Sequence, residues 1–510
     1  MRNSKPNVVI VGAGIGGLTL ALELHAAGIE CTLLEATQEL KELGVGINLL
    51  PHATRSLSRL GLQDALARVA VATKESVFFT RHGQLIYREP AGRFAGYEHP
   101  QFSIHRGDLH GVLLSAVTAR LGPERLNLDH SCTKAIQDEN GVTLAFRSTS
   151  ADLPLPSARM DIVVACDGIH SRLRKQLHPD EGPPVYSGVN MWRGTTVHPP
   201  FLTGATMTRA GWLATGKLVA YPIRENIDGA GNQLVNWVAE IETPRHADRD
   251  WNRRGQLADF IGAFEDWHFD WLDVPAMIRS SAEILEYPMV DQDPLDHWTH
   301  GGLTLLGDAA HPMVPRGSNG AGQAILDARA LRDALAGIAE PAAALRAYEA
   351  ARLPATAKVV LTNRATPPDA ILREVWLRTG DRPFTRIEDV IDVSELRGIS
   401  ERYKDVAGFS HDAGVLPRQV GSRVRSHGLA HGRIAAARPT SGRVTRSGAA
   451  ANCAGARGER SCPPVTGHAW VPGLHSAVIT ISAGSHSGAV AVSRILPGPV
   501  ARRTARARPS

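Results

Sequence analysis

The chain has 510 residues, 43% of them apolar, and is therefore long enough for two or three domains with a large hydrophobic core. Its net charge of +5 is uneven, because residues 411–510 hold 14 Arg, one Asp and one Glu, which leaves a net of −7 for residues 1–410. Such an acidic body is not typical of a nucleic-acid-binding protein, and five cysteines without a CxxC pair or a metal-type Cys/His spacing favour a reducing, cytoplasmic location.

The first predicted elements form a βαβ unit with a strand at 7–11, a helix at 14–27 and a parallel strand at 30–35. The turn before the helix reads Gly12-x-Gly14-x-x-Gly17, which lets backbone N–H groups approach a pyrophosphate at the helix N-terminus. Glu35 follows Gly12 by 23 positions, close to the spacing of a carboxylate that binds ribose hydroxyls. We interpret the unit as a dinucleotide-binding site, with the tight turn of a generic α/β protein as the alternative.

A second candidate motif follows a helix predicted at 108–121 and a buried strand predicted within 161–168. It reads Asp167-Gly168-x-x-Ser171-x-x-Arg174. An ordinary strand-to-helix turn with an Asp cap explains it equally well, so both interpretations stay open.

Residues 180–295 change character and contain short β-like runs rich in Trp and Tyr, at 190–197, 217–223, 233–241 and 284–290. We predict a separate sheet inserted into the first fold. Its aromatic residues are candidates to cover a substrate, although alternate residues of a strand face opposite sides. The candidates are Trp192, Tyr221, Trp237 and Tyr287.

The third motif is GLTLLGDAAHPMVPRGSNGAGQ, from a predicted strand at 302–308 to a predicted helix at 321–337. Gly307 and Asp308 close the strand, where a carboxylate can accept hydrogen bonds from sugar hydroxyls. Prolines stiffen the next loop, and the helix beginning near Gly320 directs its positive end at a ligand. His311 is expected to be structural. Further helices are predicted at 340–363 and 400–409.

In this order the three motifs resemble those of the single-component FAD-dependent aromatic hydroxylases, over about residues 7–405. The resemblance implies an α/β, Rossmann-like FAD-binding fold of the glutathione-reductase type, with an inserted, mainly β substrate domain and a C-terminal helical segment. It divides the chain into an FAD-binding domain at 1–180 and 296–345, a substrate domain at 181–295, helices at 346–410 and a tail at 411–510. The first motif then binds the ADP part of FAD, and Asp167-Gly168 takes part in FAD and NAD(P)H binding.

Several runs resemble the phenazine hydroxylases that act on methylated phenazine carboxylates, at 43–48, 103–110, 191–194, 234–238, 287–295 and 317–327. By this resemblance, Arg106 reaches the FAD phosphates or the flavin edge, Asp308 the ribitol, and the strand through Gly46 lies along the cofactor. Arg316 and Pro312 depart from it, because both occupy positions that we associate with apolar residues there. A cation beside the flavin favours an anionic aromatic substrate. The candidates that face substrate or flavin are Arg316, Pro315 and Tyr221.

The activity implied by the resemblance is hydroxylation of an aromatic or heteroaromatic small molecule, carboxylated ones included, with NADH or NADPH and O₂ through a flavin C4a-hydroperoxide. An FAD-dependent oxidoreductase without oxygen insertion is the alternative. A flavin halogenase is disfavoured because the WxWxIP motif is absent. We assign no acid–base residue and no metal, and expect a monomer or homodimer without nucleic-acid or membrane partners.

The two ends of the chain need separate interpretations. Arg2 and Lys5 precede an apolar run, but its glycine pattern fits the βαβ turn better than a signal peptide, and no segment is predicted to span a membrane. Residues 411–510 are rich in Gly, Ala, Ser, Arg and Pro, which predicts disorder apart from a candidate strand at 477–480. We interpret this tail as a frameshift or read-through product. A tail that binds nucleic acid or membranes is the alternative, although it lacks aromatic platforms and an amphipathic face.

Overall fold

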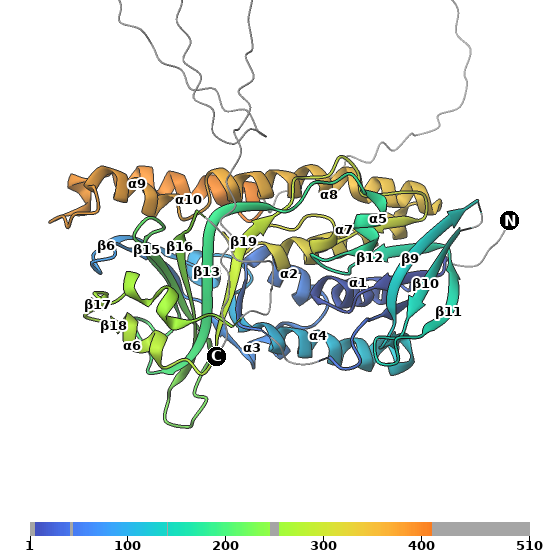
Figure 1. The fold of residues 1–510 in the computed structure, drawn as a ribbon, viewed down its shortest axis with the longest axis horizontal. Coiled ribbons are helices and arrows are strands. Elements are labelled where there is room, and N and C mark those ends of the chain that lie inside the picture. Colours follow the sequence, from blue (N-terminus) through green and yellow to red (C-terminus); the bar gives the residue numbers. More distant parts are fainter. Residues whose placement is uncertain (1–5, 41–43, 140, 245–253, 411–510) are drawn as a thin grey trace, which may run out of the picture. The chain divides into compact units, whose positions relative to one another are not determined.

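The computed structural model describes residues 6–40, 44–139, 141–244 and 254–410 (Figure 1). The predictions made for residues 411–510, including disorder and the strand at 477–480, lie outside these ranges. None of the helices in the described ranges has the length and apolar content needed to cross a membrane.

A parallel five-stranded sheet forms the first layer, in the order β20-β12-β1-β2-β8. Three of its strands are buried along their whole length, as expected where both faces of a parallel sheet are covered. The predicted strands at 7–11, 30–35, 161–168 and 302–308 are thereby confirmed. The strands are β1 (Val8–Val11), β2 (Cys31–Leu34), β8 (Leu126–Asn127), β12 (Ile162–Ala165) and β20 (Leu303–Leu305).

Helix α1 (Ile15–Ala26) connects β1 to β2 and packs against α4 (Arg106–Leu121) and α7 (Gly320–Gly337). These three helices confirm the predictions at 14–27, 108–121 and 321–337. Two small three-stranded antiparallel sheets flank this layer. One contains β3 (Gly46–Leu49), β4 (Ala70–Ala72) and β7 (Phe102–His105), and the other β9 (Ser131–Asp138), β10 (Gly141–Arg147) and β11 (Pro154–Met160).

A seven-stranded sheet forms the second large layer, in the order β19-β13-β16-β15-β14-β5-β6. Five of its strands lie within the Trp- and Tyr-rich region at 180–295. They are β13 (Val185–His198), β14 (Thr206–Trp212), β15 (Gly216–Arg224), β16 (Gln233–Glu242) and β19 (Ile284–Asp291). The other two, β5 (Glu75–Phe79) and β6 (Leu85–Pro90), come from the region before residue 180. The sheet is therefore larger than predicted, because β5 pairs in parallel with β14 and covers what would otherwise be an open edge.

The C-terminal helices are α8 (Pro341–Ala365), α9 (Ala370–Thr379) and α10 (Val393–Ala407), which lie along the top of the view in Figure 1. Helix α8 confirms the prediction at 340–363, and the one at 400–409 is the end of the longer α10. Helix α9 packs against β14 and β5, and α10 packs against α8 and α9. The remaining α-helices and β-strands are short: α2 (Pro51–Arg59), α3 (Gln63–Ala67), α5 (Arg172–Leu177), α6 (Val274–Arg279), β17 (His268–Phe269) and β18 (Leu272–Asp273).

Candidate active site

A cavity of about 350 Å³ lies between the carboxyl ends of the parallel strands and one face of the seven-stranded sheet. Ligands of open α/β sheets bind beyond the carboxyl ends of the strands, so this is the expected place for a site. The cavity brings together candidates from all three motifs and from the inserted sheet. Those that line it are Gly14, Gly46, Arg106, Gly168, Tyr221, Gly307, Asp308, Pro315, Arg316 and Gly320.

The first glycine turn is packed too tightly for side chains at two of its glycines. A Cβ on Gly12 would lie 2.4 Å from the Cys166 carbonyl oxygen, and Gly12 has a φ of +105°. A Cβ on Gly17 would lie 2.0 Å from the Gly12 oxygen. Gly14 differs, because it lines the cavity and a Cβ there meets nothing of the protein within 4 Å. Gly12 and Gly17 thus shape the turn, while Gly14 presents its backbone to the cavity.

Two helix N-termini open onto this one cavity. Ile15 begins α1 and Gly320 begins α7, and both line the cavity. In the described part of the chain, neither helix has a side-chain cap on its first N–H groups. Free N–H groups and the positive end of the helix dipole favour a negatively charged ligand at both places.

Glu35 does not line the cavity but holds the glycine turn. Its Oε2 accepts a hydrogen bond of 2.8 Å from the Ala13 amide, and its Oε1 accepts one of 2.9 Å from the Thr37 amide. A carboxylate has about four acceptor sites, so Glu35 retains capacity for a sugar hydroxyl. Its ribose-binding role stays a prediction.

The Asp167-Gly168 motif caps a helix and reaches the third motif through Arg174. Asp167 accepts hydrogen bonds from the Ser171 hydroxyl at 2.6 Å and the Arg172 amide at 3.0 Å. Burial raises the pKa of the Asp167 carboxyl. The buried Arg174 guanidinium donates to the carbonyl oxygens of residues 309 and 310, at 3.0 and 2.7 Å. The motif therefore supports the loop that follows Asp308, whatever it contributes to a ligand.

Asp308 lines the cavity, and its side chain is accessible from it. Burial raises the pKa of its carboxyl, and the charges of His311 and Arg106 oppose that shift. Gly307 before it has a φ of +63°, and its N–H donates to Asp327 Oδ2 at 3.2 Å. An acceptor carboxylate at the end of β20 is thus held facing the cavity.

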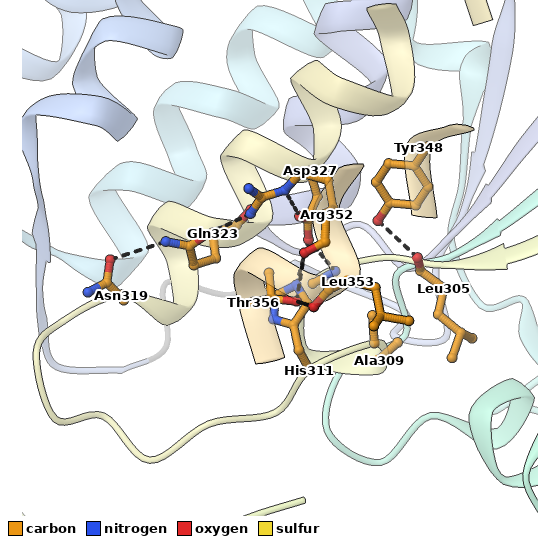
Figure 2. A network of polar contacts seen from close by, with 12 residues as sticks. Leu305, Ala309, His311, Asn319, Gln323, Asp327, Tyr348, Arg352, Leu353 and Thr356 are labelled. Atoms are coloured by element: carbon orange, nitrogen blue, oxygen red, sulfur yellow. Dashed lines mark hydrogen bonds and ion pairs between the residues drawn. The ribbon is translucent and has the colours of Figure 1, made fainter. Parts of the chain in front are cut away.

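A buried polar network supports the same loop (Figure 2). Asp327 of α7 accepts from Arg352 Nε at 2.6 Å, and His311 Nε2 lies 2.6 Å from its other oxygen. Arg352 also donates to the Gln323 side chain at 2.6 Å. This is the structural role predicted for His311.

Strand alternation decides which residues of the inserted sheet face the cavity. Trp192 and Trp237 point away from it into a hydrophobic core, where each stacks on Phe260, with ring centroids 4.9 and 6.1 Å apart. Of the four aromatic candidates, only Tyr221 is among the residues that line the cavity. The other cavity-lining residues of the inserted sheet occupy alternate positions of β13, β14, β15 and β16. They are Met191, Arg193, Met207, Arg209, Lys217, Val219, Val238 and Glu240.

Gly46 joins the small sheet to the inserted sheet at the cavity wall. Its carbonyl oxygen accepts from the Tyr221 hydroxyl at 2.9 Å and from Arg193 Nη2 at 2.7 Å. Its N–H donates to Asn236 Oδ1 at 2.8 Å. Because the Gly46 carbonyl is occupied, Tyr221 and Arg193 are fixed in position at the cavity.

Four charged side chains, all buried, form an ion-pair cluster at one end of the cavity. Lys217 Nζ lies 2.9 Å from Glu240 Oε2 and also pairs with Asp369. Arg209 Nε lies 3.2 Å from the other Asp369 oxygen. Burial favours a raised pKa for the Asp369 carboxyl, but Lys217 and Arg209 outweigh it, so the pKa lies below its usual value. The cluster pairs two cations with two carboxylates.

Arg316 adds positive charge to this end of the cavity and lowers the pKa of Asp369, but within the described ranges it forms no ion pair. Its Nε and Nη2 are inaccessible to solvent and have no hydrogen-bond partner among the described residues. Arg193 Nε is also inaccessible to solvent and has no hydrogen-bond partner among the described residues. A buried guanidinium with unpaired donors is costly unless an acceptor binds it. The cavity therefore offers a place for an anionic group.

The sequence analysis missed the residues of the ion-pair cluster. The sequence feature that could have indicated them is a charged residue inside a largely apolar strand, Lys217 in β15 and Glu240 in β16. Charged residues are rarely buried unless they are paired, so both positions indicate a buried partner. Asp369 carried no comparable signal, because it lies in the short connection before α9.

The fold and the cavity define a dinucleotide-dependent enzyme with a substrate pocket under a β-sheet. Residues 5–193 and 276–363 match the sequence profile of a family described as "FAD binding domain". The chain belongs to this family, among the FAD-dependent aromatic hydroxylases, and the predicted family, fold class and cofactor FAD are confirmed.

Curated relatives span most of the described chain. The chain is 38% identical to phenazine 1,6-dicarboxylic acid hydroxylase of Lysobacter antibioticus over 80% of its own length and 98% of that protein. It is 34% identical to a 3-amino-4-hydroxybenzoate 2-monooxygenase of Streptomyces platensis, over 71% of this chain and 88% of the relative. These relatives bear out the prediction of an aromatic-ring monooxygenase.

Solved structures support the fold alone, because their sequence identity is low. A salicylate hydroxylase substrate complex has a TM-score of 0.61 at 23% identity, over 81% of this chain and 97% of that one. HpxO of Klebsiella pneumoniae with FAD and uric acid has a TM-score of 0.62 at 22% identity, over 79% and 95%.

Proposed function

We propose that this monooxygenase uses NADH or NADPH and O₂ to hydroxylate an aromatic or heteroaromatic ring that carries a carboxylate. The observation that supports a carboxylated substrate is the half-buried Arg316, which lines the cavity and whose Nε and Nη2 have no hydrogen-bond partner among the described residues. The names of two relatives describe a phenazine dicarboxylic acid and an aminohydroxybenzoate as substrates, and both are carboxylated rings.

The charges at this end of the cavity support the same substrate class. Five cations line the cavity, Arg106, Arg193, Arg209, Lys217 and Arg316, against three carboxylates, Asp308, Glu240 and Asp369. An anionic substrate balances the excess, whereas a cationic substrate would increase it. A carboxylate also matches the planar fork of a guanidinium, which can donate two parallel hydrogen bonds to it.

The cavity residues also suggest how FAD is held. Its pyrophosphate fits the free N–H groups at the start of α1 beside Gly14, and Arg106 supplies a positive charge for the phosphates. Asp308 is placed to accept hydrogen bonds from the ribityl hydroxyls. The backbone at Gly46 would form the wall beside the cofactor, and the N-terminus of α7 at Gly320 would lie near its ring.

When bound, FAD supplies hydride acceptance and oxygen activation. The chain's own task is to orient the ring, exclude water and stabilise negative charge on the cofactor. The N-terminus of α7 suits the last of these, since a partly buried helix end contributes up to about 2 kcal/mol toward a negative charge. Arg316 and Pro315 would hold the substrate against the cofactor, with Tyr221 bounding the opposite wall. No acid–base residue is assigned.

The test is substrate-stimulated oxidation of NADH and of NADPH by the purified protein. Phenazine carboxylates, aminohydroxybenzoates and hydroxynicotinates are compared with their neutral amides, and products are analysed after turnover in ¹⁸O₂. We expect the carboxylated rings to stimulate oxidation and to gain one labelled oxygen. A hydroxylated product without label would support the oxidoreductase alternative, and equal turnover of the amides would contradict the carboxylate assignment.

A further inference from the structure

Three histidines converge outside the cavity. His178 caps the C-terminus of α5, and His297 and His300 lie in the turn before β20. The ring centroids are 4.9, 5.4 and 4.5 Å apart, and one nitrogen of each ring lies within 4.8 Å of the other two. Three imidazoles from distant parts of the chain thus present their nitrogens to one point.

Two of these rings have unmet bonding capacity. The Nε2 atoms of His178 and His300 are inaccessible to solvent and lack a hydrogen-bond partner within the described ranges. Leaving such a group buried and unpaired costs about 1–3 kcal/mol. His297 is exposed, so an ion has access to the cluster from solvent.

The charged neighbours do not use up this capacity. Glu349 faces His300, but its Oε2 accepts the Trp298 and Thr299 amides at 2.7 and 2.6 Å. Near His178, Glu181 pairs with Arg174. Burial lowers the pKa of His178 and of His300, and the neighbouring histidine charges lower both further.

We propose that His178, His297 and His300 bind one divalent transition-metal ion of the Zn²⁺ type, with water as the fourth ligand. Imidazole nitrogens suit Zn²⁺, Cu²⁺ and Ni²⁺ and not the oxygen-preferring Ca²⁺ or Mg²⁺. Tetrahedral Zn²⁺ with bonds of about 2.0–2.1 Å needs nitrogens about 3.4 Å apart. The three nitrogens, which lie within 4.8 Å of one another, would have to approach to this spacing when the ion binds.

The position of the cluster indicates a structural ion. None of the three histidines lines the cavity. His178 ends the helix whose Arg174 holds the carbonyls at 309 and 310, and His300 precedes the strand that leads to Asp308. An ion here ties together the two segments that support the Asp308 loop, and we expect it to slow FAD release.

Sequence spacing predicted no metal site, because His178 lies 119 residues before His297. Only the pair His297-x-x-His300 is local, and two histidines at that spacing do not define a site. The third ligand joins them only in the fold.

The experiment titrates Co²⁺ into untagged, chelator-treated full-length protein and follows its visible d–d absorption, with Zn²⁺ as competitor. We expect one high-affinity ion per chain and a higher melting temperature with Zn²⁺. His297→Gln and His300→Gln should each weaken binding at least about 100-fold, since loss of an outer-shell partner alone costs about 10–100-fold. His25→Gln, at an exposed histidine of α1, should bind like the wild type.

Circular dichroism and FAD content show whether each variant is folded, and His297 is exposed, so its replacement spares the core. Absence of saturable Co²⁺ binding by the wild type would overturn the proposal. So would unchanged binding by both variants, which would place the ion on other histidines. Neither result depends on the substrate assignment.

Discussion

Nε2 of His311 lies 2.6 Å from Oδ2 of Asp327, at the base of the loop that carries Arg316. The other Asp327 oxygen accepts from Arg352 Nε, so one fully buried carboxylate serves two partners and the Gly307 amide (Figure 2). The cavity wall above depends on this carboxylate.

Asp327→Asn should lower the free energy of unfolding by about 3–5 kcal/mol, because removing one partner leaves buried charge uncompensated. Urea unfolding measures the change. Asp333→Asn is the matched control on the same helix, since Asp333 pairs with Arg329 at an exposed position, where a pair is worth about 0–1 kcal/mol. Equal losses in the two variants would contradict a central role for Asp327.

The same carboxylate predicts a pH dependence. Burial favours a raised pKa for Asp327, but His311 and Arg352 outweigh it, and the pKa lies below its usual value. Its contribution to stability is then complete above about pH 4, near the unfolded pKa, and is lost as pH falls through the lower folded pKa. Between pH 5 and pH 3, unfolding free energy should fall more steeply in the wild type than in Asp327→Asn. Parallel curves would contradict the assignment.

The glycine turn allows a test that separates packing from ligand contact. Gly17→Ala places a Cβ against the Gly12 oxygen and should destabilise the FAD-free protein by about 1–3 kcal/mol. Gly14→Ala meets no protein atom within 4 Å and should leave that stability unchanged. Because Gly14 lines the cavity, its variant should bind FAD at least about tenfold more weakly. Thermal melting and FAD titration measure the two effects, and wild-type FAD affinity in Gly14→Ala would refute the proposed approach of the cofactor.

Such local constraints explain how much of the site could be predicted. Gly12, Gly17 and Asp308 are required by a turn or a strand end, so a few neighbouring residues are enough to predict their roles. The roles of Arg209, Lys217 and Asp369 depend on their pairing with one another, across two strands and the connection before α9. Short-range patterns predict strands well but do not contain this pairing. For the same reason β5 was not assigned to the large sheet, because its partner β14 follows more than a hundred residues later. Strand β6 joins that sheet only through β5.

Arg316→Met should raise the KM for a carboxylated substrate by about 10- to 150-fold, the loss expected when a charge-assisted hydrogen bond of about 1.5–3 kcal/mol is removed. Arg316→Lys should restore part of the affinity, since it keeps the charge but not the planar fork. The KM for the neutral amide should not change, and neither should FAD affinity. Steady-state NAD(P)H oxidation provides the comparison, and a similar rise for acid and amide would show that Arg316 only shapes the cavity.

Lys217 tests the buried cluster, because its side chain is 1% exposed and contacts both Glu240 and Asp369. Lys217→Met leaves the buried Glu240 without an ion-pair partner among the described residues and should cost about 3–5 kcal/mol of unfolding free energy. Adding Glu240→Gln removes this unpaired charge while Arg209 still pairs with Asp369, so the double variant should be more stable than Lys217→Met alone. Urea unfolding of the two single variants and the double variant gives the coupling energy. Strictly additive losses would mean that Lys217 and Glu240 do not act as a pair, and that the cavity end is held by packing instead of charge balance.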